Sequence, residues 1–382
     1  MKRILIVAGE ASADRYGARL ARKLRTLHPG DSLQFFGTGG DAMEREGIQL
    51  LCHIRLLASI GPREALAHFR VYYETFQKIL RSCLDDPPAV AVLLDFPEFN
   101  LRLAKKMKRA GVRVIYYISP QLWAWRSGRI HIIRDYVDQM LVILPFEEKY
   151  YRERGVNAQF VGHPLLEDFA PESDRESFLR CINLVPGRKT IALLPGSRRR
   201  EVKFMLPTLI RAARRILEKM PAQFIISAAP SVSAEEIRRL AAQELAGDPN
   251  ALYFKIVSKE SRDILANADF GIVKSGTSTL EAALVGVPFV IVYKISNISW
   301  HVGNFLVRSP FKGLVNLIAE KQIVPEFFQG DATPEALSGA VLEYFERPQK
   351  LATMRSGLSE IREKLSLRCA SDAVAAVVER YL

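Results

Sequence analysis

The stretch KRILIVAGEASAD, residues 2–14, joins an apolar run to a turn of small residues. Its first half is short and rich in Ile and Val, which is typical of a strand buried on both faces. The small residues that follow allow a sharp turn into a helix, and Ser12 or Asp14 could cap that helix. The stretch therefore predicts a strand–turn–helix unit, in which the same two side chains could instead face a ligand.

Strand-like and helix-like patterns alternate along the rest of the chain. In the first half, strands are expected at residues 33–36, 89–94, 112–118, 139–144 and 159–161, and helices at 64–84 and 100–110. In the second half, strands are expected at residues 191–194, 223–227, 252–257, 270–273 and 289–293. This alternation predicts parallel βαβ units and an α/β fold.

The alternation pauses at residues 163–174, where prolines and acidic residues indicate a linker. We therefore predict two Rossmann-like, doubly wound parallel-sheet domains, at residues 1–170 and 171–355. No strand is expected after about residue 314, and residues 356–382 are predicted to be helical and to pack back on the first domain. Two such sheets in series place ligands in a central cleft, at the carboxyl ends of the strands.

Composition narrows the classes of function. The 382 residues carry 54 Lys and Arg against 42 Asp and Glu, a net charge of +12, which implies an anionic partner. The basic residues are dispersed and match no nucleic-acid motif, so we expect no nucleic-acid role. The four cysteines form no CxxC pair, which argues against a zinc site. No secretory pattern and no run of about 20 apolar residues appears, so we expect a cytoplasmic protein.

The stretch GTGGDA, residues 37–42, fits the glycine pattern of a dinucleotide-binding turn. An NAD(P)-dependent oxidoreductase is therefore one alternative. Two features count against it: the motif follows the second expected strand rather than the first, and no acidic residue ends the next strand. We expect no cofactor.

Two further motifs follow strands of the first half. LDFPEFN, residues 94–100, places Asp95 and Glu98 just past a strand end, where one carboxylate could act as a general base or, alternatively, cap a helix. SPQLWAWR, residues 119–126, sets Trp123 beside Arg126, a pairing that suits sugars, phosphates or lipid headgroups unless the aromatics pack inward.

In the second half, LPGSRRRE, residues 194–201, and KSGTSTLE, residues 274–281, each join a strand to a helix through glycine and hydroxyl residues. Backbone N–H groups at such turns bind anions, and two turns in one domain favour a diphosphate. Glu281 could accept hydrogen bonds from a ribose diol. No D-x-D triplet occurs, so we expect no metal; the helix N-termini and Arg198 would stabilise departing charge instead.

These motifs occur in the order GEASAD, LDFPEFN, YYISPQLWAWRSGR, LPFEEKYY, FVGHPL, LLPGSRRREV, SGTSTLEAALVGVP and GLVNLIA. Together they resemble the lipid-A-disaccharide synthase family, inverting glycosyltransferases of the GT-B fold, over nearly the whole chain. The resemblance implies transfer of 2,3-diacylglucosamine from UDP-2,3-diacylglucosamine to 2,3-diacylglucosamine 1-phosphate (lipid X). The product is the β-1′,6-linked disaccharide 1-phosphate, and UDP leaves.

The resemblance also implies residue roles. Binding of UDP would fall to Gly196, Ser197, Arg198, Ser275, Gly276, Thr277, Ser278, Glu281 and Asn316. Binding of the acceptor would fall to Ser12, Asp14, Trp123 and Arg126, with Glu98 or Asp95 as the base. Two positions depart from the usual family pattern: Ala13 replaces a glycine, and Glu98 replaces an Asp. Two alternatives therefore stay open, a weakened or non-catalytic binder of UDP-sugar lipids and a different UDP-sugar enzyme of this fold.

Acylated substrates imply contact with the cytoplasmic face of the inner membrane, where the basic excess suits an anionic surface. The apolar stretches at residues 298–307 and 311–318 could form a docking face or could equally be core. The resemblance further implies a homodimer.

Overall fold

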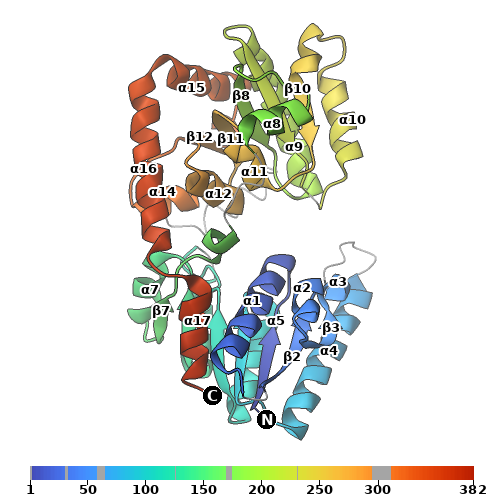
Figure 1. The fold of residues 1–382 in the computed structure, drawn as a ribbon, viewed down its shortest axis with the longest axis vertical. Helices are drawn as coiled ribbons and strands as arrows, with labels where there is room; N and C mark the ends of the chain where they lie inside the picture. Colours follow the sequence, from blue (N-terminus) through green and yellow to red (C-terminus); the bar gives the residue numbers. More distant parts are fainter. Residues whose placement is uncertain are drawn as a thin grey trace. The chain divides into compact units, whose positions relative to one another are not determined.

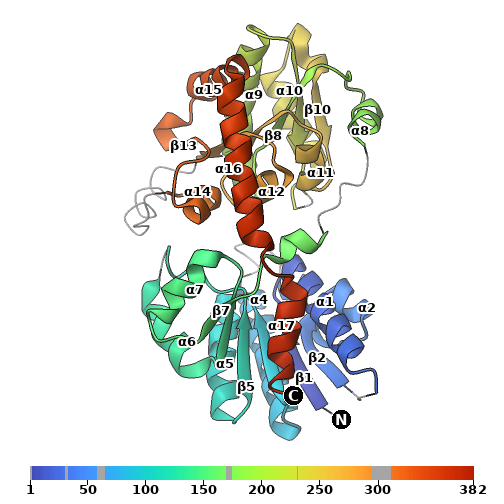
Figure 2. The same cartoon turned by 60° about the vertical axis from the view of Figure 1, so that its left-hand side comes forward.

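The computed structural model describes residues 2–30, 33–57, 65–124, 126–168, 174–229, 231–294 and 311–382. The chain divides into two compact units, which are described separately below. The first unit contains Met1–Glu167 and the C-terminal segment Leu365–Leu382, and the second contains Asp168–Lys364. Each unit is a parallel sheet with helices on both faces (Figures 1 and 2).

The first unit contains a seven-stranded sheet in the order β3-β2-β1-β4-β5-β6-β7. Its strands are β1 (Lys2–Val7), β2 (Leu33–Gly39), β3 (Gln49–His53), β4 (Val90–Leu94), β5 (Arg113–Tyr117), β6 (Gln139–Val142) and β7 (Ala158–Phe160). All neighbouring strands run parallel, as in β1 paired with β2 and with β4. This is the strand order of a Rossmann-like sheet, in which the winding direction reverses beside β1.

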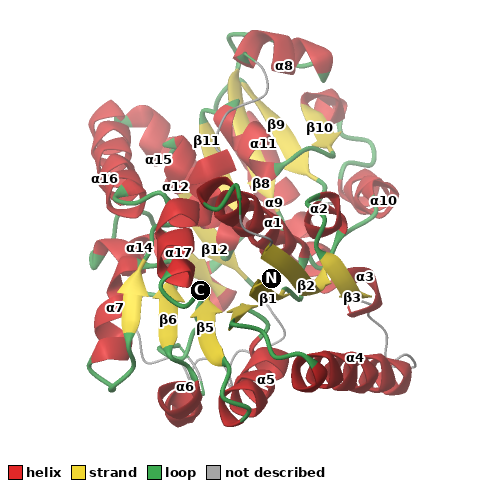
Figure 3. Ribbon diagram, turned by 60° about the horizontal axis from the view of Figure 1, so that its bottom comes forward, coloured by secondary structure: helices red, strands yellow, loops and turns green. Residues whose placement is uncertain are grey.

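Alternate side chains of β1 enter different cores. Ile4 and Ile6 pack with α1 (Ala11–Leu27) and α17 (Ala370–Glu379). Leu5 and Val7 pack with α4 (Ala65–Asp85) and α5 (Pro97–Arg109), and all four side chains of β1 are fully buried. The period of two along a strand therefore explains the continuous apolar run in the sequence. Figure 3 shows the strands between these two layers of helices. The helices of this unit are α1 (Ala11–Leu27), α2 (Asp41–Arg45), α3 (Ile54–Leu57), α4 (Ala65–Asp85), α5 (Pro97–Arg109), α6 (Ile130–Tyr136), α7 (Pro145–Arg152) and α17 (Ala370–Glu379).

The second unit contains a six-stranded parallel sheet in the order β10-β9-β8-β11-β12-β13. Its strands are β8 (Lys189–Leu194), β9 (Ala222–Ser227), β10 (Phe254–Val257), β11 (Phe270–Lys274), β12 (Phe289–Tyr293) and β13 (Glu326–Phe328). Its helices are α8 (Arg175–Cys181), α9 (Arg199–Leu217), α10 (Ala234–Glu244), α11 (Ser261–Ala266), α12 (Thr277–Val285), α14 (Leu314–Ala319), α15 (Pro334–Glu346) and α16 (Pro348–Ser366). The predicted α/β class with two parallel sheets is confirmed.

Two of the four edge strands, β3 and β13, escaped the sequence-based prediction. The expectation of no strand after about residue 314 is wrong, because β13 pairs with β12 at that edge of the sheet. β13 has only three residues, all of them partly buried. So short a run lacks the apolar length that marks the central strands.

The last helix, α17, belongs to the first unit, where it packs on α1. Val374, Val377 and Val378 enter the same core as Ile4 and Leu20. The backbone N–H of Ser371 donates a 2.6 Å hydrogen bond to Glu167 Oε1, which fixes the start of this helix. The C-terminal segment is therefore part of the core of the first unit.

No helix within the described ranges is both long and apolar enough to cross a membrane. Of the two candidate docking stretches, residues 298–307 lie outside the described residues. In residues 311–318, Val315 and Ile318 of α14 are buried. That second stretch therefore contributes to the core at these positions.

Candidate active site

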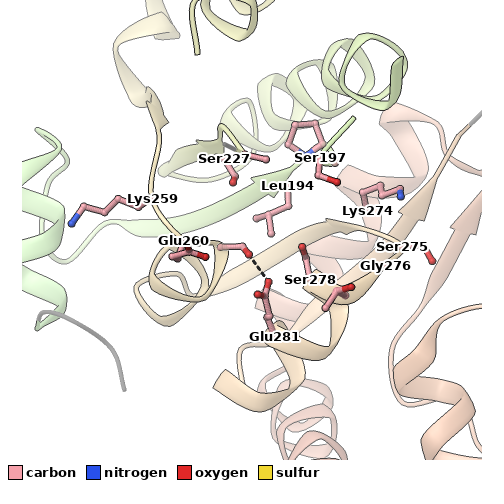
Figure 4. Close-up of a pocket in the computed structure, with 15 residues that line it drawn as sticks. Leu194, Ser197, Ser227, Lys259, Glu260, Lys274, Ser275, Gly276, Ser278 and Glu281 are labelled. Atoms are coloured by element: carbon pink, nitrogen blue, oxygen red, sulfur yellow. Dashed lines mark hydrogen bonds between the residues drawn. The ribbon is translucent and has the colours of Figure 1, made fainter. Parts of the chain in front are cut away.

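A pocket of about 270 Å³ lies at the carboxyl ends of β8, β9 and β11 in the second unit (Figure 4). Among its lining residues are seven that the sequence analysis assigned to UDP: Gly196, Ser197, Ser275, Gly276, Thr277, Ser278 and Glu281. They come from two turns that lie side by side because β8 and β11 are hydrogen-bonded neighbours, with Leu194 opposite Val273. The structure therefore brings the two predicted anion-binding turns into one pocket.

Glycine is required at the first of these turns. Gly196 has a φ of +118°, and a Cβ added there would lie 2.6 Å from Glu201 Oε2. The second turn contains Gly276, with a φ of +155°, immediately before α12. Each turn leads directly into a helix, α9 or α12, whose N-terminal end is electropositive. The pocket thus combines a close backbone approach with two helix N-termini, an arrangement suited to a diphosphate.

Glu281 lies one turn into α12 and lines the same pocket. Ser261 Oγ, at the start of α11, donates a hydrogen bond to its carboxylate. Burial raises the pKa of Glu281, and the hydrogen bond from Ser261 opposes that shift. A carboxylate held in this way can accept hydrogen bonds from a diol.

Two residues assigned to UDP are not brought to the pocket. Asn316 is fully buried, and its amide bonds internally to Val324 O at 2.8 Å and to Glu326 Oε1 at 2.7 Å. Asn316 therefore fixes the connection between α14 and β13. The side chain of Arg198 is 82% exposed and is not part of the pocket lining.

Five polar residues that line the pocket had been given no role from the sequence: Ser227, Lys259, Glu260, Ser261 and Lys274. Ser227 and Lys274 each end a strand, β9 and β11, and the other three follow β10. The rule that ligands bind at the carboxyl ends of parallel strands applied to these positions as well. Four of them lie outside the glycine-rich motifs that marked the other two turns, and Lys274 begins the motif KSGTSTLE but was given no role there.

In the first unit, Asp95 follows β4 in a strained backbone. Asp95 and Phe96 have φ values of +46° and +48°, two consecutive non-glycine residues in the left-handed region. The Asp95 carbonyl accepts hydrogen bonds from Tyr116 Oη at 2.6 Å and Asn100 Nδ2 at 2.8 Å. Gly9 makes room for the Phe96 ring, because a Cβ at Gly9 would lie 2.3 Å from that ring. The surrounding residues thus hold a conformation that costs energy, as is common at functional sites.

The carboxyl group of Asp95 has a shifted pKa. Burial raises it to about 6, the charge of Glu10 adds to the shift, and a hydrogen bond from the Phe96 N–H opposes it. A carboxylate with a pKa near 6 is a better proton acceptor than an exposed one and is still mostly ionised at neutral pH. Asp95 therefore has the properties of a general base.

Glu98 is in a different environment. It is exposed, and Arg129 Nη2 contacts its two carboxylate oxygens at 2.7 and 2.8 Å, while Arg126 donates a further hydrogen bond. Partial burial raises the pKa of Glu98, but the hydrogen bonds and charges of Arg129 and Arg126 outweigh it, so that the pKa is lowered. A carboxylate paired in this way is a weak base.

The predicted acceptor residue Asp14 is buried and is bonded to backbone. Its carboxylate accepts hydrogen bonds from the N–H groups of Gly40 at 2.6 Å, Ala42 at 3.0 Å and Met43 at 3.0 Å. The first two N–H groups belong to the GTGGDA motif and that of Met43 directly follows it, at the start of α2. Asp14 thus occupies the position where a dinucleotide phosphate would bind, which removes the geometric basis of the oxidoreductase alternative. Ser12 Oγ, nearby, donates to the Glu10 carboxylate.

Trp123 is bonded to a buried acid. Its indole N–H donates a 3.0 Å hydrogen bond to Glu147 Oε1, and the N–H of Leu144 donates to Glu147 Oε2 at 3.2 Å. Burial raises the pKa of Glu147 to about 7, against hydrogen bonds led by that from Trp123. The aromatic motif is therefore attached to α7 by a buried carboxyl group.

One cluster in the described part of the chain has metal-ligand character. Asp41, Glu44 and His53 place ligand atoms within 4.8 Å of one another. However, Arg55 Nη2 lies 2.6 Å from Asp41 Oδ2, and the Arg55 N–H donates to His53 Nδ1. These contacts use lone pairs and charge that a metal would need, so the cluster is accounted for as an ion-pair network.

Solved structures with the same fold extend over the whole chain. UDP-GlcNAc 2-epimerase from Neisseria meningitidis, bound to UDP-GlcNAc, has a TM-score of 0.67 at 10% identity, covering 99% of this chain and 100% of that one. A putative UDP-N-acetylglucosamine 2-epimerase from Listeria monocytogenes has a TM-score of 0.68 at 12% identity, and the match covers 100% of this chain and 97% of that one. At these identities the likeness concerns the fold alone. Fold and pocket together define an α/β protein of the GT-B class.

The sequence comparison is more specific. The family model Lipid-A-disaccharide synthetase matches residues 4–378. Lipid-A-disaccharide synthase from Geobacter metallireducens is 39% identical over 382 residues, covering 100% of this chain and 97% of that protein. The enzyme of the same name from Coxiella burnetii is 36% identical, and the match covers 100% of this chain and 99% of that protein. The chain belongs to the lipid-A-disaccharide synthase family of glycosyltransferases, which confirms the predicted family and class of enzyme.

Proposed function

We propose that this chain transfers 2,3-diacylglucosamine from UDP-2,3-diacylglucosamine to lipid X. An acceptor hydroxyl attacks the anomeric carbon, the bond from that carbon to the β-phosphate oxygen breaks, and UDP leaves. The acceptor proton passes to an enzyme carboxylate, and the product is the β-1′,6-linked disaccharide 1-phosphate. The observation that carries this proposal is the family match over residues 4–378, joined to a pocket that contains both predicted anion-binding turns.

The donor UDP is assigned to the pocket of the second unit. The turns at Gly196–Ser197 and Ser275–Ser278 would hold the diphosphate through backbone N–H groups and hydroxyls. Glu281 would accept hydrogen bonds from the ribose. The fold shared with an epimerase that binds UDP-GlcNAc supports this assignment.

Asp95 is assigned as the base. Its raised pKa and the held, strained backbone support this role over Glu98, whose carboxylate is paired with two arginines. We propose that Arg126 binds the phosphate of the acceptor and that Glu98 orients Arg126 and Arg129 through its ion pairs with them. Asp14 and Trp123 would then contribute to acceptor binding indirectly. Asp14 fixes the turn before α2, and Trp123 fixes the segment that carries Arg126.

We also propose that the protein associates peripherally with the inner membrane and forms a homodimer. The acylated substrates and the net charge of +12 support the first proposal. Co-sedimentation with vesicles containing an anionic phospholipid, lost at high salt, is the expected result; equal binding to neutral vesicles would oppose it. Light scattering of the purified protein tests the dimer.

The function is tested by UDP release in detergent micelles. Purified protein with UDP-2,3-diacylglucosamine and lipid X should release UDP, and omission of lipid X should abolish the release. No release with both substrates would refute the proposal.

The same assay separates the alternatives. Turnover of UDP-N-acetylglucosamine, which has no 3-O-acyl chain, at a comparable rate would indicate a different UDP-sugar enzyme. Tight binding of the acylated donor without any UDP release would indicate a binding protein.

A further inference from the structure

Lys274 is the last residue of β11 and immediately precedes the second glycine turn. Its side chain is 16% exposed and lines the pocket assigned to UDP. The Nζ atom lies 2.9 Å from Glu201 Oε1 and 4.9 Å from the centre of the Tyr293 ring. The ammonium group is therefore held in place beside the two turns.

Its partner Glu201 lies in the first turn of α9, with its side chain 8% exposed. The second carboxylate oxygen accepts a hydrogen bond from the Arg198 N–H at 3.3 Å. The ion pair between Lys274 and Glu201 therefore joins the end of β11 to the start of α9. These two elements flank the two anion-binding turns, so the pair also sets the spacing between them.

An ammonium group has three N–H donors. Within the ranges that the structure describes, Glu201 is the one hydrogen-bond partner found for Lys274 Nζ. Two donors are thus left to a ligand in the pocket. A cation with spare donors, in a pocket with two helix N-termini, favours a ligand with several negative oxygens.

The other cations near the pocket are placed differently. The Arg198 side chain is 82% exposed and lies outside the lining. Lys259 lines the pocket, but its Nζ lies 5.6 Å from the centre of the Phe178 ring in α8. Figure 4 shows the side chains of Lys259 and Lys274 extending in opposite directions. Lys274 is therefore the cation that a buried carboxylate holds at the pocket.

We propose that Lys274 Nζ binds a phosphate oxygen of the nucleoside diphosphate and stabilises the charge on the departing UDP, with Glu201 fixing its position. This inference rests on the proposed function. Rupture of the bond between the anomeric carbon and the phosphate oxygen leaves negative charge on UDP, which a fixed cation stabilises. Lys274 takes the part that the sequence analysis gave to Arg198.

The test measures the affinities of UDP and uridine by calorimetry for the wild type, Lys274→Met and Lys219→Met. Lys274→Met should weaken UDP binding by about 10- to 100-fold, as expected for loss of a charge-assisted hydrogen bond. Uridine affinity should stay within about twofold, because uridine has no phosphate. Lys219→Met, the matched control, should change UDP affinity by less than about threefold, because Lys219 is exposed and is not among the residues that line the pocket.

Removing Lys274 alone leaves the buried Glu201 carboxylate without its cation, which could prevent folding. The double variant Lys274→Met/Glu201→Gln removes both charges and should show the same selective loss of UDP affinity. Wild-type UDP affinity in either folded variant, or an equal loss of UDP and uridine affinity in both, would overturn the role of Lys274. Absence of UDP binding in the wild type would instead refute the proposed function, and this inference with it.

Discussion

At the residue scale, two carboxylates three positions apart have opposite environments. Asp95 is partly buried with a raised pKa, whereas Glu98 is exposed and its pKa is lowered by Arg129 and Arg126. The family resemblance pointed at Glu98 because it stands where the family usually has an Asp, although the Glu side chain is one methylene longer. The replacement of Asp by Glu at position 98 matters less if this side chain orients Arg126 and Arg129, because the longer carboxylate still pairs with both.

Asp95→Asn should lower kcat by about 10²- to 10⁴-fold, the usual contribution of a general base. The substitution keeps the size of the side chain and removes the proton acceptor. UDP affinity should not change, because the UDP pocket is assigned to the second unit. Steady-state UDP release and calorimetry measure the two quantities, and Glu98→Gln is the comparison. A larger loss of kcat for Glu98→Gln than for Asp95→Asn would reverse the assignment.

The pH profile should follow the pKa of Asp95, which burial raises to about 6. A base acts when deprotonated, so activity is present above this pKa and is lost as the pH falls through it. We expect kcat/KM to be level near pH 8 and to fall about tenfold per pH unit below about pH 6. The profile should persist in Glu98→Gln. A profile that stays flat down to about pH 4.5 would show that the base has an unshifted pKa.

At the element scale, the turn between β8 and α9 depends on a glycine. Gly196→Ala would bring a Cβ to 2.6 Å from Glu201 Oε2 at a φ of +118°, which displaces the turn or the carboxylate. We expect UDP affinity to fall by at least about tenfold, the equivalent of 1.4 kcal/mol. Gly187→Ala is the matched control, because Gly187 also has a positive φ, +87°, but no atom lies within 4 Å of its Cβ position. Equal UDP affinity in both variants would contradict this account.

The segment after β5 depends on a buried acid in α7. Glu147→Leu would leave the Trp123 indole N–H and the Leu144 N–H without their acceptor. Two such losses should lower the free energy of unfolding by about 2–5 kcal/mol, measured by urea denaturation. Glu147→Gln keeps an acceptor oxygen and should lose less. If the Leu variant were as stable as the wild type, these hydrogen bonds would not secure the segment.

Central elements were predictable because they carry long apolar runs. The strands at 89–94 and 270–273 were predicted within a residue or so of β4 and β11. The glycine turns were predictable because only small residues allow them. The partners of Asp14 and Lys274 were not predictable, because each side chain pairs with groups distant in the sequence, such as Glu201 for Lys274. Hydrogen bonding of that kind leaves no local pattern.

At the scale of the whole molecule, the chain forms two units with different chemistry. The second holds the pocket assigned to UDP, and the first holds the carboxylate assigned as base. The C-terminal segment Leu365–Leu382 returns to the first unit, so that unit contains both ends of the chain. Transfer with inversion requires a bound donor and a base that activates the acceptor. In the proposed roles, the second unit binds the donor and the first unit supplies the base.

The most direct test of this account is the identity of the product. Purified enzyme with UDP-2,3-diacylglucosamine and lipid X should form one disaccharide 1-phosphate for each UDP released, as measured by mass spectrometry. Nuclear magnetic resonance of the product should show a β linkage to the 6-position, because inversion at the anomeric carbon converts the α-linked donor. An α linkage, or UDP released without disaccharide, would contradict the account.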